Sequence, residues 1–170
     1  MRRFFSGVAA GLALALVSAT GASAQQKEVT IAYQDMVVPW RVAMADKMLE
    51  QATGWTVNWR QFGGGGDVIK AMASGDIAIG EAGSSPIAAA LSQGLPLELF
   101  WILDDSGAAE ALIVRNESGI KTPADLKGKK VATPFVSTSH YHLMFALSEA
   151  GLKPGDVQVL NLRPAEIAAA

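Results

Sequence analysis

The sequence predicts an α/β fold in which short, largely parallel strands alternate with helices that cover both faces of the sheet. Two observations lead to this prediction. Apolar runs of strand length recur along the 170-residue chain, with runs of helical spacing between them. Proline or small polar residues precede several of the helical runs, and glycine follows several of them. Half of the residues are hydrophobic, which is typical of a packed globular protein.

The first third of the mature chain contains two predicted helices. Pro39 opens one that should run to Ala52, since proline at the first helical position costs no hydrogen bond. After a flexible turn at residues 63–66, apolar side chains repeat at helical spacing over residues 68–73 until Gly75 ends them. Strands are expected at residues 29–33, 55–62 and 76–80.

The rest of the chain is also predicted to alternate between helices and strands. Helices are expected at residues 87–93, behind Pro86, and at 140–150, which Ser137 or Thr138 would cap and Gly151 would end. A short capped helix is expected at residues 122–126. Further strands are predicted at residues 97–103, 110–115, 129–133 and 157–162. Alternating short strands and helices favour a parallel sheet.

Two polar clusters stand where a strand-like run gives way to a helix-like one: Gly83-Ser84-Ser85-Pro86 and Ser137-Thr138-Ser139-His140. The first N–H groups of a helix have no intrahelical partner, and the helix dipole is positive there. A small oxyanion is therefore the natural ligand of each turn. Because ligands of open α/β sheets lie beyond the carboxyl ends of the strands, we expect both turns to converge on one crevice.

The N-terminus is typical of a cleavable secretory signal. Arg2 and Arg3 precede an apolar run over residues 4–17, and Ala22 and Ala24 have the spacing of a cleavage site. Cleavage between Ala24 and Gln25 would remove residues 1–24. The alternative is a membrane anchor, but the run is shorter than the roughly 20 residues that span a bilayer. We expect an exported protein.

Charge and composition argue against several classes of function. The formal net charge is −2, and residues 1–24 hold two arginines and no acidic residue, which leaves −4 for the mature chain. That balance argues against a nucleic-acid surface. The chain has no cysteine, and its two histidines have no carboxylate cluster near them in the sequence, so we expect no metal site.

Five sequence runs carry a resemblance to a known family. The chain resembles the periplasmic taurine-binding proteins of ABC importers, within the wider family that binds sulfonates, nitrate and thiamine precursors. The runs are VTIAYQ (29–34), ASGDIAIG (73–80), GSSP (83–86), EALIV (110–114) and PFVSTSHY (134–141).

The resemblance implies a lobe like those of type II periplasmic binding proteins, in a two-lobed clamp with the ligand at its hinge. Residues 25–133 would form the first ligand-binding lobe, and residues 134–170 would begin a second. Members of that family have about twice this length, at roughly 250 to 300 residues for a two-lobed binder, so a truncated chain is expected. The implied partners are taurine or a related small sulfonate and an ABC permease with its ATPase. A periplasmic monomer without cofactor is expected.

The resemblance also assigns site residues. Ser84 and Ser85 would bind the sulfonate from one side, and Ser137 and Thr138 from the other, although each could be an ordinary helix cap. Gln34 would contact the zwitterion or lie in a surface loop. Glu110 would face the ammonium group or pair with a neighbouring lysine or arginine. The matching turn also contains His140 and Tyr141, and aromatic walls of the pocket are expected from Trp40 and Phe135.

Other functions stay open. A binder of another aliphatic sulfonate or small anion would use the same turns but would not need Glu110. An enzyme acting on a small anionic substrate is the alternative from another class. The chain lacks a Gly-x-Ser-x-Gly elbow around Ser84, and its glycine run at residues 63–66 lacks the ending of a P-loop. A regulator's effector lobe is a third possibility, but it would lack the signal.

Overall fold

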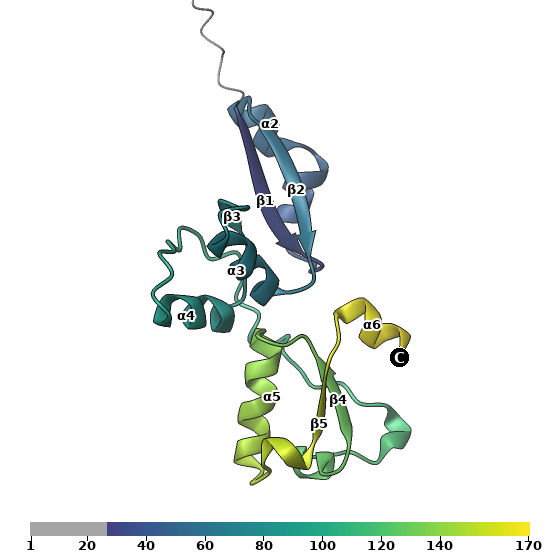
Figure 1. Cartoon of the computed structure of the whole chain (residues 1–170). Helices are drawn as coiled ribbons and strands as arrows, with labels where there is room; N and C mark the ends of the chain where they lie inside the picture. The colour runs from purple at the N-terminus through teal and green to yellow at the C-terminus, as the bar shows by residue number, and fades with distance from the viewer. Residues whose placement is uncertain (1–26) are drawn as a thin grey trace, which may run out of the picture.

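The computed structural model describes residues 27–170 and contains two parallel sheets (Figure 1). The predicted signal peptide and its cleavage site at Ala24/Gln25 lie outside these residues. Every strand pair is parallel, so the predicted α/β class is confirmed. The first sheet has the order β2-β1-β3, with β1 (Glu28–Gln34), β2 (Thr56–Phe62) and β3 (Ile79–Gly80). The second sheet pairs β4 (Lys130–Thr133) with β5 (Gln158–Asn161).

The first sheet packs against helix α3 (Gly65–Ala73), which contacts all three of its strands. Ala32 of β1 and Val68 of α3 are fully buried in this core. A Cβ atom at Gly80 would lie only 2.6 Å from the Val68 side chain, so the absence of a side chain lets α3 approach β3. The paired part of β3 is shorter than the predicted strand at residues 76–80.

The predicted helix at residues 39–52 is broken into two short helices, α1 (Trp40–Ala45) and α2 (Met48–Thr53). Lys47 between them has a φ of 53°, which is left-handed and interrupts the helix. Neither helix contains a buried residue. A continuous helix usually depends on the packing of an apolar face, and no side chain of these two helices is fully buried.

Two predicted strands, at residues 97–103 and 110–115, are wrong: the structure has no strand in either segment. Strand pairing needs a neighbour that supplies backbone donors and acceptors, and no part of residues 27–170 does so. Apolar side chains of both segments are exposed, among them Phe100, Ile102 and Ile113. The segments connect helix α4 (Ser84–Ser92), the 3₁₀ turn η1 (Asn116–Ser118) and the second sheet.

The second sheet packs against α5 (Thr138–Glu149), which was predicted at residues 140–150. The core of this part consists of Leu126, Val131, Leu143, Leu147 and Val157. Its other elements are the 3₁₀ turns η2 (Pro123–Leu126) and η3 (Pro154–Asp156) and the terminal helix α6 (Pro164–Ala169). The predicted lobe boundary after residue 133 stays a prediction; β4 before it pairs with β5 after it.

The glycine run at residues 63–66 lies where the two parts meet. The structure places Gly65 and Gly66 inside the first turn of α3, rather than in a flexible turn. A Cβ atom at Gly66 would lie 3.1 Å from the Val136 side chain, and one at Gly64 would lie 3.7 Å from Pro134. A side chain at Gly66 would therefore be tightly packed against the second part, whereas one at Gly64 would make an ordinary contact. Within residues 27–170, no helix is long and apolar enough to cross a membrane.

A capping carboxylate gives η2 a testable pH dependence. Asp125 Oδ2 accepts hydrogen bonds from the Lys121 and Thr122 N–H groups, at 3.0 and 2.8 Å, and these bonds lower the pKa of Asp125. Because the folded-state pKa is lowered, its stabilisation is present above the unfolded-state pKa and is lost as pH falls through the folded-state value.

We expect Asp125→Asn to lower the free energy of unfolding at neutral pH, with a difference from the wild type that vanishes in acid. Urea unfolding at a series of pH values measures this difference. The matched control is Asp104→Asn, at an exposed aspartate that accepts no hydrogen bond within the described chain. A difference between Asp125→Asn and the wild type that is constant with pH would contradict the capping role.

Candidate functional site

The two polar turns lie against each other at the junction of α4 and α5 (Figure 1). A Cβ atom at Gly83 would lie 2.1 Å from Thr138 Oγ1, so the backbone of the first turn directly contacts a hydroxyl of the second. Both helices begin at this point, at Ser84 and Thr138. Their positive dipole ends therefore meet in one place, as a shared anion site requires.

In the first turn, the serine hydroxyls are not occupied by capping. Gly83 is the N-cap residue of α4, and Ser84 and Ser85 are the first two residues of the helix. Neither hydroxyl makes a hydrogen bond with any described residue, and Ser84 is exposed while Ser85 is half-buried. Both side chains are thus available as donors to a bound anion.

In the second turn, Ser137 caps the helix. Its hydroxyl accepts a hydrogen bond from the His140 N–H at 3.1 Å and donates one to the Pro134 carbonyl at 2.6 Å. Its only hydroxyl proton is used in the second of these bonds, which leaves Thr138 as the side-chain donor that faces the first turn. Val136, just before the cap, has a φ of 55°, a left-handed value that a β-branched residue rarely adopts.

The aromatic side chains of the second turn divide into two groups. His140 stacks on Phe135 with ring centroids 4.8 Å apart and an angle of 18° between the planes. This stack orders the turn and leaves Phe135 42% exposed beside it. Tyr141 is exposed, and its ring lies near His142 instead. The structure therefore brings His140 and Phe135 together and places Tyr141 apart from them.

A buried carboxylate that the sequence analysis did not select, Glu81, lies directly after β3. It accepts hydrogen bonds from the Gln34 N–H and, at 2.9 Å, from the Trp40 indole N–H. The Gln34 side-chain amide donates to the Glu81 carbonyl at 3.2 Å. Gln34 and Trp40, which were both predicted to contact the ligand, are thus connected through Glu81. The sequence feature that could have indicated Glu81 is its position as an acidic residue between an apolar strand and the Gly-Ser-Ser-Pro turn.

Trp40 also packs against Trp59, with ring centroids 4.8 Å apart and the two planes tilted by 57°. Trp59 in turn makes an edge contact with Tyr33 of β1. These aromatic contacts hold the Trp40 indole at the carboxyl edge of the first sheet, with its N–H directed to Glu81. Burial raises the pKa of Glu81, although the hydrogen bonds from Gln34 and Trp40 and the nearby charge of Arg41 act against that rise.

Glu110 lies near the first turn of α5. One of its carboxylate oxygens is 3.4 Å from the Ser139 hydroxyl and 3.6 Å from His142 Nδ1. Its neighbour is thus a histidine, rather than the lysine or arginine that the sequence analysis considered. No group of three or more potential metal-ligating side chains occurs within residues 27–170.

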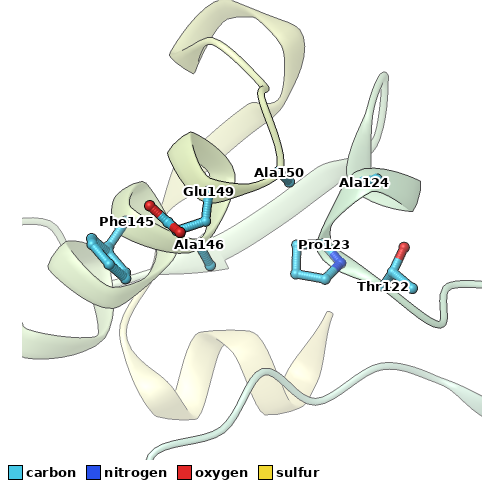
Figure 2. Close-up of a pocket in the computed structure, with 7 residues that line it drawn as sticks. All are labelled: Thr122, Pro123, Ala124, Phe145, Ala146, Glu149 and Ala150. Atoms are coloured by element: carbon cyan, nitrogen blue, oxygen red, sulfur yellow. The ribbon is translucent and has the colours of Figure 1, made fainter.

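A shallow cavity of about 470 Å³ lies away from the polar turns (Figure 2). It is formed between η2 and the C-terminal half of α5, whose N-terminus carries the second turn. Figure 2 shows side chains of Phe145, Ala146 and Glu149 on one side and those of Thr122, Pro123 and Ala124 on the other. None of the predicted site residues lines this cavity, and its walls offer little to recognise an anion.

Comparison with known proteins identifies the family. The model of the family described as NMT1/THI5 like matches residues 51–170, which is most of the chain. The chain belongs to the NMT1/THI5-like family. The matched part of this NMT1/THI5-like chain includes both polar turns, Glu81 and Glu110, whereas β1 and Gln34 precede it.

Individual relatives match more of the chain. The taurine-binding periplasmic protein of Escherichia coli (strain K12) is 45% identical over 92% of this NMT1/THI5-like chain, which covers 48% of that relative. In structure, the chain is similar to the alkanesulfonate-binding protein SsuA from Xanthomonas axonopodis pv. citri bound to MOPS. The TM-score is 0.75, with 32% identity over 85% of this chain and 50% of that one.

The periplasmic aliphatic sulphonate binding protein SsuA from Escherichia coli is similar at a TM-score of 0.61 and 32% identity, again over 85% of this chain and 50% of that one. The predicted lobe of the periplasmic-binding-protein type is thus confirmed. The chain spans about half the length of the relatives it matches.

Proposed function

We propose that this protein is the substrate-binding component of an ABC importer that captures taurine. The sulfonate group of the ligand would lie between the N-termini of α4 and α5. It would accept hydrogen bonds from backbone N–H groups and from the hydroxyls of Ser84, Ser85 and Thr138. In this proposal, Ser137 holds the second turn in shape through its cap, and His140 orders it through its stack on Phe135.

The observation that carries the proposal is the contact between Gly83 and Thr138. It brings two helix N-termini and three hydroxyl groups that do not serve as helix caps to one place. Several neutral donors in a protein environment of low dielectric can bind a monoanion. A sulfonate, with three equivalent oxygens, can accept hydrogen bonds from both turns at once.

The relatives support the same chemistry. Sulfonate binding appears in the descriptions of the similar SsuA structures, and taurine binding in that of the E. coli relative. Those relatives are periplasmic, which supports export of this protein through its N-terminal signal. A permease and its ATPase would then be the partners, and the protein would act as a binder rather than an enzyme.

A second candidate ligand is an aliphatic sulfonate without an amine. The similarity to an alkanesulfonate-binding protein favours it, and it would use the same two turns. The two ligands differ at the other end of the site, where only taurine would need a carboxylate.

Calorimetric titration of taurine and ethanesulfonate into the full-length gene product tests the proposal. We expect both ligands to bind and taurine to bind more tightly. We expect the double variant Ser84→Ala/Ser85→Ala to weaken both, because each lost hydrogen bond to a charged group costs about 1.5 to 3 kcal/mol. Ser92→Ala, at the other end of α4, is the matched control, since its hydroxyl donates to the Ala89 carbonyl within the same helix.

The titrations test sulfonate binding, the role of the α4 turn and the preference for taurine separately. A wild-type protein that binds neither sulfonate would exclude the proposed function. Sulfonate binding that is unchanged in the double variant would exclude the α4 turn as the anion site. Equal affinity for both ligands would favour the amine-free alternative.

A further inference from the structure

Glu81 is a buried carboxylate without a cation close enough to neutralise it. Its side chain and backbone are 7% exposed. Among the described residues, no lysine, arginine or histidine nitrogen lies within 4.0 Å of its carboxylate. Burying a charged group is costly unless the group is paired and hydrogen-bonded. Glu81 accepts two hydrogen bonds, from Gln34 and Trp40, but these bonds do not replace an ion pair.

Arg41 is the nearest candidate for a partner, but it is directed elsewhere. Its guanidinium carbon lies 4.9 Å from the centre of the Tyr33 ring, in a cation–π contact. Its Nη1 atom is buried and has no hydrogen-bond partner in the described chain. The charge of Arg41 favours the ionised form of Glu81, yet burial is the larger effect and raises the pKa.

Glu81 also has capacity left to bind a further donor. An ionised carboxylate offers about four acceptor positions, and Glu81 uses one on each oxygen. An ammonium group carries three donors and a full positive charge, so it could use the remaining positions and supply the missing cation. Trp40 and Gln34 hold the carboxylate in place from β1 and the segment after it.

The position of Glu81 matches the far end of a short zwitterion. Only Ala82 separates it in sequence from Gly83, which contacts Thr138 in the proposed sulfonate site. Successive Cα atoms are about 3.8 Å apart, so the backbone of Glu81 is at most about 8 Å from that of Gly83. A ligand with an anion and a cation separated by two carbons could contact both.

We infer that Glu81, in preference to Glu110, is the residue that recognises the ammonium group of the ligand and so determines specificity for amino-sulfonates. This inference rests on the proposed function. Glu110 is less suited because it is more exposed and already faces Ser139 and His142. Glu81 is nearly buried, and no side-chain cation faces it at close range in the described chain.

The test compares taurine with ethanesulfonate in Glu81→Gln of the full-length gene product. Glutamine keeps the shape and one acceptor but removes the charge. We expect taurine affinity to fall roughly 10- to 100-fold, the range for a lost hydrogen bond to a charged group. Ethanesulfonate affinity should stay close to that of the wild type. Glu110→Gln is the matched control and should leave the ratio of the two affinities unchanged.

Several results would overturn the inference. If Glu81→Gln weakens both ligands equally, Glu81 only positions Gln34 and Trp40. If the taurine preference disappears in Glu110→Gln instead, Glu110 is the amine-binding residue. A wild type that prefers taurine, with both variants unchanged, would exclude both carboxylates and leave the proposed function intact. A wild type that binds neither ligand would contradict the proposed function itself.

A second measurement covers the case in which Glu81→Gln does not fold. The carboxyl ¹³C resonance of Glu81 in the wild type, assigned through its backbone, should shift when taurine is added and stay in place with ethanesulfonate. A resonance that responds equally to both ligands, or to neither, would exclude direct recognition of the ammonium group.

Discussion

Replacing Gly83 by alanine is expected to weaken sulfonate binding by roughly 10- to 100-fold, which corresponds to an overpacking cost of about 1 to 3 kcal/mol. The backbone of Gly83 has φ −68° and ψ 164°, values that any residue adopts, so the effect is steric. The new Cβ atom would lie 2.1 Å from Thr138 Oγ1. One turn would have to move away from the other, and the shared anion site would open.

Calorimetric titration of taurine into Gly83→Ala measures this loss. The matched control is Gly155→Ala, because a Cβ atom at Gly155 would meet nothing within 4 Å. Adding Thr138→Ala to Gly83→Ala removes the clashing oxygen, and the next atom of Thr138 lies 3.4 Å from the new Cβ. The two substitutions should therefore be strongly non-additive. Unchanged affinity in Gly83→Ala would contradict the convergence of the turns.

Replacing Leu147 by alanine is expected to lower the free energy of unfolding by about 2 to 5 kcal/mol, the range for a large-to-small change in a packed core. Leu147 is 1% exposed and lies on the face of α5 that packs against the second sheet. Its neighbours in that core include Leu126 and Val157. A cavity would remain, because the strand and the 3₁₀ turn around it are held by their own hydrogen bonds.

Urea unfolding of the full-length gene product measures the effect of Leu147→Ala. Leu91→Ala, at a half-exposed leucine of α4, is the matched control and should change stability by less than about 0.5 kcal/mol. A loss in Leu147→Ala as small as that of the control would show that the α5 core contributes little. Taurine affinity of the folded variant should persist, since Leu147 lies more than two helical turns from Thr138.

Apolar periodicity predicted some elements well and others wrongly, and the difference follows from their partners. Strands β1, β2, β4 and β5 each find a parallel neighbour within the described chain. The equally apolar segments at residues 97–103 and 110–115 find none and stay unpaired. A run of apolar residues thus indicates a tendency to form a strand, whereas the strand itself depends on a second segment.

Some residues of the candidate site could likewise be predicted from the sequence and others could not. The serine and threonine turns were visible in the sequence because capping residues and glycine-rich turns are local signals. Glu81 was not selected, since its importance depends on burial and on hydrogen bonds with Gln34 and Trp40, which are more than 40 residues away in the chain. The break at Lys47 was likewise invisible, because no local breaker marks it.

The sequence by itself determined the α/β class, the parallel strands and the two polar turns, because periodicity, caps and glycines act over a few neighbouring residues. Only the tertiary structure decided which apolar runs became strands and which serine hydroxyl was consumed by a cap. It also decided how closely Gly83 approaches Thr138 and which carboxylate, that of Glu81, is buried. These features join segments far apart in the chain, and their energies depend on distances and burial that local patterns do not contain.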